Sequence, residues 1–325
     1  MDDERKILKE GSVRNRVEDI SRVFGKHSGM KVCIEASTKT FWMADQLSEL
    51  GLEPIPVDPG KTKAIGSGLI KNDKLDARVL ATLCQANVVA RVDHPDAETR
   101  HARMVVVSRD GVVRSRSRLM TLVRSLLDSE GYELRHLTAK SFPEAVRGMF
   151  SELPEMIQTA LTPLLDAIEA MNEQVAVCDK IINERTKGDK VAQLLCTVPG
   201  VGPIVASTFI SAIRDPKRFD SGRSVGAYLG LVPSLYESGT IHRKGRVTKH
   251  GNRQARWALT MAASVMLGVS KQHSSLREWG LRISKKHGRK KAVVAVARKL
   301  AGVLWAMWRD ERAFRYSGTS MKVAA

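Results

Sequence analysis

The chain contains few of the residues that mark several common protein classes. It has four cysteines in 325 residues, and these form neither a Cys-x-x-Cys pair nor a Cys/His cluster, so a zinc site or a disulfide framework is not suggested. Apolar runs stay well short of the roughly eighteen residues that a membrane helix needs. The charged start MDDERKILKE does not resemble a signal peptide. These absences predict a soluble cytoplasmic protein without a membrane segment.

Acidic residues become scarce only in the last third of the chain. Residues 1–100 hold 16 Lys or Arg against 16 Asp or Glu, residues 101–200 hold 13 of each, and residues 201–325 hold 24 against 6. The whole formal charge of +18 therefore belongs to the last third. Because Lys and Arg neutralise phosphates and release counterions, this asymmetry predicts a nucleic-acid-binding region attached to a neutral remainder. A merely basic protein is the alternative.

Hydrophobic periodicity divides the chain into three parts. In the first part, helical patterns at 17–27, 42–52 and 73–86 alternate with extended ones at 30–37 and 53–58, which predicts an α/β domain. The preceding segment ERKILKEGSVRN is predicted to be a strand or hairpin.

The rest of the chain is predicted to be mostly helical. The patterns at 104–127 and 156–182, separated by a break near 131–136, predict a helical or coiled-coil stalk. The basic remainder is predicted to be mostly helical, with glycine-rich interruptions.

Three carboxylates stand at positions suited to metal chemistry. Glu35 ends the apolar strand KVCIE, and open α/β folds bind ligands at the carboxyl ends of their strands. Asp73 and Asp76 begin a helical pattern three positions apart and share one face. Capping of the helix N-terminus is the alternative role for these aspartates. Neighbouring carboxylates become favourable when a hard cation such as Mg²⁺ lies between them, and two such ions assist phosphoryl transfer.

The same residues carry a resemblance to a known family. Glu35 together with PVDPGKTKAIG at 56–66 and KNDKLDARVLA at 71–81 resembles the insertion-sequence transposases of the family numbered one hundred and ten. The resemblance implies a RuvC-like (RNase H-type) domain with an Asp-Glu-Asp-Asp tetrad, of which Glu35, Asp73 and Asp76 are the last three members and Mg²⁺ ligands. The family's first aspartate lies on an apolar first strand, which this sequence lacks. We therefore expect a truncated start, through a misplaced initiation codon or gene decay, and the activity of the chain is open.

A glycine-rich turn joins two apolar helical patterns within LLCTVPGVGPIVASTFISAI, residues 194–213. It resembles a helix-hairpin-helix motif, in which Gly200 and Gly202 let backbone N–H groups approach a phosphate. An ordinary helix turn is the alternative, because glycines serve any tight turn.

A strongly basic stretch follows, with Ser238 at its start. Up to residue 256 it contains no acid and six cations, namely Arg243, Lys244, Arg246, Lys249, Arg253 and Arg256. A serine among such cations can attack a phosphodiester while the cations stabilise charge on the transferring group. A turn serine before glycine is the alternative, and no Ser-His-Asp arrangement is apparent.

The family's C-terminal domain carries the signature S-G…G-R-[IV]-[TS]-K-x-G-[ND]-x-x-x-R, which this chain matches from Ser238-Gly239 to Arg256. The resemblance implies that Ser238 attacks DNA and forms a covalent phosphoserine intermediate, with the tetrad and Mg²⁺ completing the site across a subunit boundary. Ser234 is the main rival for this role. Further on, the cationic cluster SKKHGRKK at 284–291 precedes an amphipathic helical pattern.

These features together predict a DNA transposase or recombinase in three domains: an acidic RuvC-like domain (1–95), a helical stalk (96–190) and a basic domain with the serine (191–325). The resemblance implies donor and target DNA, a structured guide RNA and a homodimer or homotetramer as partners. Two other functions stay open, a structure-specific nuclease that cuts branched DNA with the carboxylates and an inactive nucleic-acid-binding relic.

Overall fold

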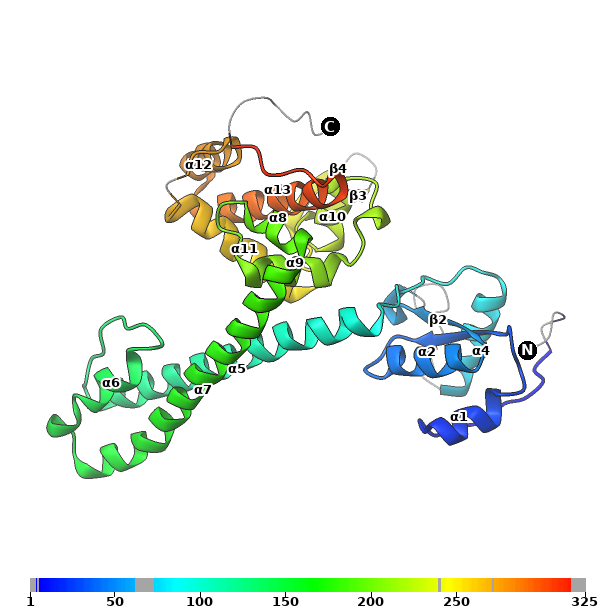
Figure 1. Cartoon of the computed structure of the whole chain (residues 1–325), viewed down its shortest axis with the longest axis horizontal. Coiled ribbons are helices and arrows are strands. Elements are labelled where there is room, and N and C mark those ends of the chain that lie inside the picture. Colours follow the sequence, from blue (N-terminus) through cyan, green and yellow to red (C-terminus); the bar gives the residue numbers. More distant parts are fainter. Residues whose placement is uncertain (1–3, 5, 62–72, 239–240, 271, 317–325) are drawn as a thin grey trace. The chain divides into compact units, whose positions relative to one another are not determined.

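The computed structural model describes residues 4, 6–61, 73–238, 241–270 and 272–316 (Figure 1). The chain divides into two compact units, Met1–Asp96 and Ala97–Ala325, and each is described by itself. The finer division of the second unit into a stalk and a basic domain stays a prediction.

Two parallel strands form the sheet of the first unit. β1 (Lys31–Glu35) and β2 (Glu53–Val57) pair in parallel, with Glu35 opposite Val57 at their carboxyl ends. Parallel strands need a crossover connection, and α2 (Thr40–Glu49) supplies it. The strands and helix predicted over 30–58 are confirmed, and they have the βαβ order of an α/β domain.

The helix α4 (Asp73–Gln85), which was predicted from its helical pattern, packs against this sheet. Its Cys84 is disulfide-bonded to Cys33 of β1, with 6.2 Å between the two Cα atoms. Ile55 and Val57 of β2 are buried around this bond. The expectation that no disulfide forms is therefore wrong: the two cysteines are 51 positions apart, and only the fold brings them together.

The segment before the first helix makes a contact that the sequence did not predict. Residues 6–14 have no regular secondary structure, so the strand or hairpin predicted over 4–15 is wrong. Glu10 instead accepts two hydrogen bonds from the guanidinium of Arg78 in α4, at 2.8 and 2.9 Å. This charged pair ties the segment to the helix that carries Asp76.

The buried apolar side chains of the first unit form two small clusters. One contains Ile20 of α1 (Val17–Phe24), Leu47 of α2 and Leu52. The other contains Ile55, Val57 and Cys84. Each cluster joins a helix to the sheet, so the cysteine bond lies within a core of modest size.

Two long helices begin the second unit and lie side by side (Figure 1). They are α5 (Ala97–Ser129) and α7 (Glu155–Gly188), and both were predicted from their periodicity. The short helices α6 (Phe142–Arg147) and η1 (Phe150–Glu152) connect them over a core that includes Val123, Leu127, Phe142, Leu161, Leu165 and Ile168. Farther along, Arg109 of α5 pairs with Asp179 of α7.

The largest core is enclosed by the helices that follow. These are α8 (Lys190–Cys196), α9 (Pro203–Ile213), η2 (Pro216–Arg218), α10 (Gly222–Tyr228), α11 (Arg253–Gly268), α12 (Ser275–His287) and α13 (Arg289–Asp310). Leu195, Phe209, Leu229, Leu259 and Leu300 are fully buried among them. The predominance of helix agrees with the prediction. None of the described helices combines the length and apolar character that crossing a membrane requires.

A β-hairpin separates α10 from α11. Its strands β3 (Pro233–Ser238) and β4 (Ile241–Val247) are antiparallel, and Ser238 faces Ile241 across a two-residue connection. The sequence predicted a glycine-rich interruption here, not a hairpin.

Gly230, Gly251 and Arg256 hold the base of this hairpin, and we call them the clasp. Both glycines have a left-handed backbone, with φ of +67° and +81°, and a Cβ on Gly230 would lie 2.0 Å from the carbonyl oxygen of His250. The Arg256 NH1 lies 3.2, 2.7 and 3.0 Å from the carbonyl oxygens of Leu229, His250 and Gly251. The clasp therefore fixes the hairpin to α10 and α11.

The cysteine bond predicts a thiol count. We expect two reactive thiols per unfolded chain without reductant, from Cys178 and Cys196, and four after reduction. Titration with a thiol reagent in denaturant measures this number. The control variant Cys33→Ser should show three, since it frees Cys84. A wild-type chain with four thiols before reduction would contradict the bond.

The clasp predicts a loss of stability in Arg256→Met. This change leaves backbone carbonyls without their charged donor, so the free energy of unfolding should fall by about 2 kcal/mol. Denaturant unfolding followed by circular dichroism measures it. The matched control Arg253→Met removes an exposed cation from the same helix and should change stability by less than about 0.5 kcal/mol. Equal effects of the two substitutions would refute the role of the clasp.

Candidate functional site

Ser238 lies at the tip of the hairpin. It is the last residue of β3 and pairs with Ile241, the first residue of β4. The Ser238 side chain and residues 239–240 lie outside the described part of the chain. Ser238 and Ile241 are the paired positions farthest from the base of the hairpin, so this backbone position suits a group that must reach a partner.

Ser234, the rival, lies near the base of the same strand. Its hydroxyl donates a hydrogen bond to the carbonyl oxygen of Arg246, at 3.1 Å. It is half-buried, beside an irregularity in the strand register between Pro233 and Leu235. The hydroxyl of Ser234 therefore already has a structural partner in β4.

The predicted phosphate-binding cations divide into two groups. Arg243, Arg246, Lys249 and Arg253 have exposed side chains along β4 and at the start of α11, while the Lys244 side chain lies outside the described part. Arg256 instead belongs to the clasp. Burial, and then the neighbouring Arg253, lower the pKa of Arg256 from its usual value.

The signature residues between β4 and α11 have local structural roles. Asn252 caps α11, and its Oδ1 accepts hydrogen bonds from the backbone N–H groups of Gln254 and Ala255, at 2.9 and 3.1 Å. Lys249 adopts a left-handed φ of +58°, and its N–H donates to the Gly230 carbonyl oxygen at 3.2 Å. Much of the pattern from Lys249 to Arg256 thus shapes the turn that leads out of the hairpin.

The two glycines of the predicted helix-hairpin-helix differ in their surroundings. Gly200 has φ +82°, and a Cβ there would lie 2.5 Å from the carbonyl oxygen of Ala262 in α11, so close backbone packing explains this glycine. Gly202 is the N-cap of α9, with Pro203 next, and open space surrounds its Cβ position. The first N–H groups of α9 are therefore the part of this turn that suits a phosphate. Phosphate contact at either glycine stays a prediction.

In the first unit, Glu35 and α4 lie on one side of the sheet. Glu35 and Cys33 are two positions apart in β1 and so point to the same face, which α4 covers through Cys84. Asp73 and Cys84 are eleven positions apart and fall on one stripe of α4, with Asp76 close to that stripe. Glu35 and Asp76 are exposed, and the Asp73 side chain lies outside the described part.

The chemistry of these carboxylates fits a hard divalent cation. Magnesium prefers carboxylate oxygens together with water and phosphate oxygens, and exposed carboxylates leave room for both. Within the described residues, no three His, Cys, Asp or Glu side chains gather into a metal-binding group. Joint metal binding by Glu35, Asp73 and Asp76 therefore stays a prediction.

The sequence reading overlooked a further carboxylate at this edge of the sheet. Asp58 directly follows β2, one position beyond the partner of Glu35. Its Oδ1 accepts hydrogen bonds from the N–H groups of Gly60 and Lys61, at 2.9 and 3.3 Å, so it shapes the turn after the strand. The Asp-Pro-Gly sequence is the signal that could have identified this turn.

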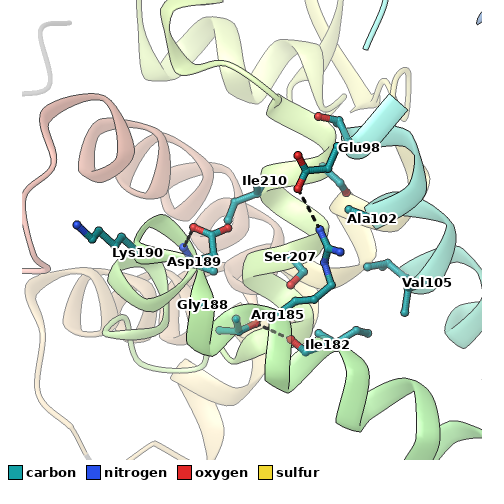
Figure 2. A pocket seen from close by; sticks show the side chains of 15 residues that line it. Glu98, Ala102, Val105, Ile182, Arg185, Gly188, Asp189, Lys190, Ser207 and Ile210 are labelled. Carbon is teal, nitrogen blue, oxygen red and sulfur yellow. Dashed lines mark hydrogen bonds and ion pairs between the residues drawn. The ribbon is translucent and has the colours of Figure 1, made fainter. Parts of the chain in front are cut away.

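A hollow of 620 Å³ in the second unit lies among α5, α7, α8 and α9 (Figure 2). Glu98 and Arg185 form an ion pair at 3.8 Å on its wall. Asp189 caps α8 through Val191, and Thr186 donates to a carbonyl oxygen of its own helix. None of the predicted site residues is among the described residues that line it.

Comparison with known proteins gives two family matches and several relatives that match most of the chain. A profile described as "Transposase IS116/IS110/IS902 family" matches residues 192–278, and the DEDD transposase profile of the same insertion-sequence group matches residues 1–131. A probable family 20 transposase of Pseudomonas aeruginosa is 28% identical over 87% of this chain and 85% of its own length. The transposase for insertion sequence element IS1328 of Yersinia enterocolitica is 27% identical over 84% of this chain and 82% of its own.

A third relative supports the same assignment. The transposase for insertion sequence element IS1111A of Coxiella burnetii is 26% identical over 75% of this chain and 68% of its own length. The DEDD match implies a RuvC-like fold for the first unit and suggests dependence on a divalent metal. The two matches lie at the front and rear of the chain, where the carboxylates and the serine were predicted. The chain belongs to the IS116/IS110/IS902 family of transposases.

Proposed function

We propose that this transposase cuts and rejoins DNA through attack of the Ser238 hydroxyl on a phosphodiester. Family membership supports action on DNA. One observation carries the choice of serine: Ser238 ends β3 at the tip of a hairpin whose base is fixed by the clasp. The exposed cations Arg243 and Arg246 lie on the facing strand of this hairpin.

The proposed step exchanges one phosphoester bond for another. A bond forms between Ser238 Oγ and phosphorus, and the bond from phosphorus to one of the two flanking sugar oxygens breaks. The proton lost by the serine hydroxyl is taken up by the departing sugar oxygen, directly or through a carboxylate. Attack by a hydroxyl of a second DNA strand then reverses the step and releases Ser238. No external energy source is needed, since the phosphoserine conserves the bond energy.

The cations of the hairpin have a definite task in this step. Negative charge builds up on the phosphate oxygens as the nucleophile approaches, and nearby guanidinium groups stabilise it. Arg243 and Arg246 are exposed, so both are available to a phosphate. Ser234 is the weaker candidate for the nucleophile, because its hydroxyl is already bonded to the carbonyl oxygen of Arg246.

Glu35, Asp73 and Asp76 are proposed to hold Mg²⁺ in the same reaction. When bound, the metal supplies Lewis-acid stabilisation of the phosphate charge. A carboxylate among them can carry the serine proton to the departing sugar oxygen. Support comes from their carboxylate oxygens, which are ligands that Mg²⁺ prefers. It also comes from the position of Glu35 on the face of β1 that α4 covers.

We further propose nucleic-acid partners, an oligomer and three domains for this protein. A structured guide RNA pairs with donor and target DNA, and a homodimer or homotetramer supplies the several active sites that strand exchange needs. Residues 1–95, 96–190 and 191–325 serve as acidic domain, stalk and serine-bearing domain. The positive charge of the last third supports contact with two kinds of nucleic acid.

Ser238→Ala should abolish the covalent protein–DNA adduct while nucleic-acid binding persists, because the change removes only the attacking oxygen. Denaturing gel electrophoresis of labelled DNA after reaction detects the adduct. Ser234→Ala is the matched control on the same strand and should keep the adduct. An adduct that survives Ser238→Ala would move the nucleophile elsewhere, and strand cleavage without any adduct would indicate hydrolysis by the carboxylates.

Glu35→Gln and Asp76→Asn should each lower adduct formation on the order of a hundredfold, because loss of a metal ligand removes several kcal/mol of charge stabilisation. Chelation of divalent metal should have the same effect on the wild-type chain. The control Glu49→Gln, at an exposed position in α2, should leave the rate unchanged. Adduct formation that resists both substitutions and chelation would exclude the carboxylates from the reaction.

A further inference from the structure

Five cations gather where α12 meets α13. We call residues 285–291 the cationic corner, and its fully charged side chains, all exposed, are Lys285, Lys286, Arg289, Lys290 and Lys291. The corner covers the end of α12, the turn residue Gly288 and the first turn of α13. It contains no acidic and no apolar side chain. The proposed reaction of Ser238 makes no use of it.

The helices that carry the corner are closely packed, so its charges have a fixed base. A Cβ on the buried Gly280 of α12 would lie 2.5 Å from a methyl group of Val296 in α13 and 2.7 Å from one of Leu267 in α11. The guanidinium of Arg277 donates from Nε to the carbonyl oxygen of Met266, at 3.1 Å. The corner is therefore a preformed surface.

The protein itself offers these charges little compensation. Residues 279–309 contain nine Lys or Arg and no Asp or Glu. Arg289 donates from NH2 to the carbonyl oxygen of Ser264, at 3.4 Å. Within the described part of the chain, no carboxylate forms an ion pair with any of the five cations. Among the described residues no carboxylate relieves their mutual repulsion, so counterions or an external anion would lower it.

Helix electrostatics explain only two of the five cations of the corner. Lys285 and Lys286 lie in the last turn of α12, where cations complement the negative end of the helix dipole. Arg289, Lys290 and Lys291 lie in the first turn of α13, at the positive end of its dipole. That turn has no acidic residue and no side-chain cap. These three cations weaken their own helix, and an anion over them would reverse the effect.

The corner is distant from the serine hairpin within the same unit. The Arg289 guanidinium lies against Gly268, the last residue of α11, whereas the clasp residue Arg256 lies in its first turn. Twelve residues of helix separate the two positions, which is about 18 Å. In Figure 1, α12 and the β3–β4 hairpin lie at opposite ends of the helical layer. The corner is therefore a second cationic surface and not an extension of the first.

We propose that the cationic corner binds the phosphate backbone of a nucleic-acid duplex. A duplex carries one negative charge per roughly 1.7 Å of its axis, which matches a dense group of cations better than an isolated carboxylate does. A membrane surface is disfavoured, since residues 285–291 offer no apolar side chain for insertion. The choice of partner rests on the proposed function, but the site, its residues and its separation from Ser238 do not.

The salt dependence of binding tests this proposal in the full-length chain. The corner variant replaces four exposed lysines by glutamine, at Lys285, Lys286, Lys290 and Lys291. The control variant makes the same change of charge elsewhere in the second unit, at Arg118, Arg135, Lys140 and Lys180. Affinity for a short DNA duplex and for a folded RNA hairpin is measured by fluorescence anisotropy over a series of salt concentrations.

We expect the slope of log K against log salt to become shallower by about 2 or more in the corner variant, since each lost phosphate contact contributes about 0.9. The control variant should keep the wild-type slope. A change confined to DNA or to RNA identifies which of the two occupies the corner. A wild-type slope in the corner variant, or the same loss in both variants, overturns the proposal.

Two further measurements separate this test from folding defects and from the proposed chemistry. Thermal unfolding of both variants detects a folding defect, and the double change Lys290→Gln and Lys291→Gln repeats the test with half the charge and should lose about half as much slope. Ser238→Ala should keep the full slope while losing the adduct. The absence of any adduct in the wild-type chain would refute the serine mechanism and leave the slope comparison intact.

Discussion

The organisation of the serine-bearing unit depends on one close approach of two backbone segments at the base of the hairpin. Gly230 and Gly251 allow residues 228–230 to pass residues 249–251 at distances that no side chain permits, and Arg256 binds the carbonyl oxygens on both sides. A two-stranded hairpin alone is marginally stable in water, so its direction is set by this contact with the helices. Much of the family signature from Lys249 to Arg256 therefore serves to hold the hairpin in place.

The cationic corner and the clasp lie at opposite ends of α11. The clasp uses Arg256 at one end of the helix, and the Arg289 guanidinium lies against Gly268 at the other end. Residues 201–325 hold 24 cations and 6 acids. Charge repulsion therefore destabilises the compact state of this region unless a polyanion is bound. The exposed cations of β4 and those of the cationic corner lie on different surfaces. A single long nucleic acid, or two separate ones, would relieve repulsion at both places.

The sequence was most informative where structure is local. Periodicity predicted β1, β2, α4 and the long helices α5 and α7, because each repeats its pattern over a whole element. It failed where contacts join distant segments. The Cys33–Cys84 bond closes a separation of 51 positions, and the clasp joins Leu229 to Arg256. The serine and the carboxylates were proposed through the family resemblance and the cations through their density, and the roles of all three stay predictions. The structural roles of Arg256 and Gly200 could not be predicted, since the neighbours of a residue depend on packing.

The same reasoning explains why the first unit needs contacts that its apolar core does not supply. Its described core consists of two small clusters, one around Leu47 and one around Val57, and small cores leave little margin over conformational entropy. The Cys33–Cys84 bond and the pair of Arg78 with Glu10 both act on α4, the helix that carries Asp76. A ligand that binds only the folded unit stabilises it further by mass action. Metal binding at Glu35 and Asp76 would therefore order the same helix that the cysteine bond and the ion pair already restrain, and it would couple stability to metal binding through α4.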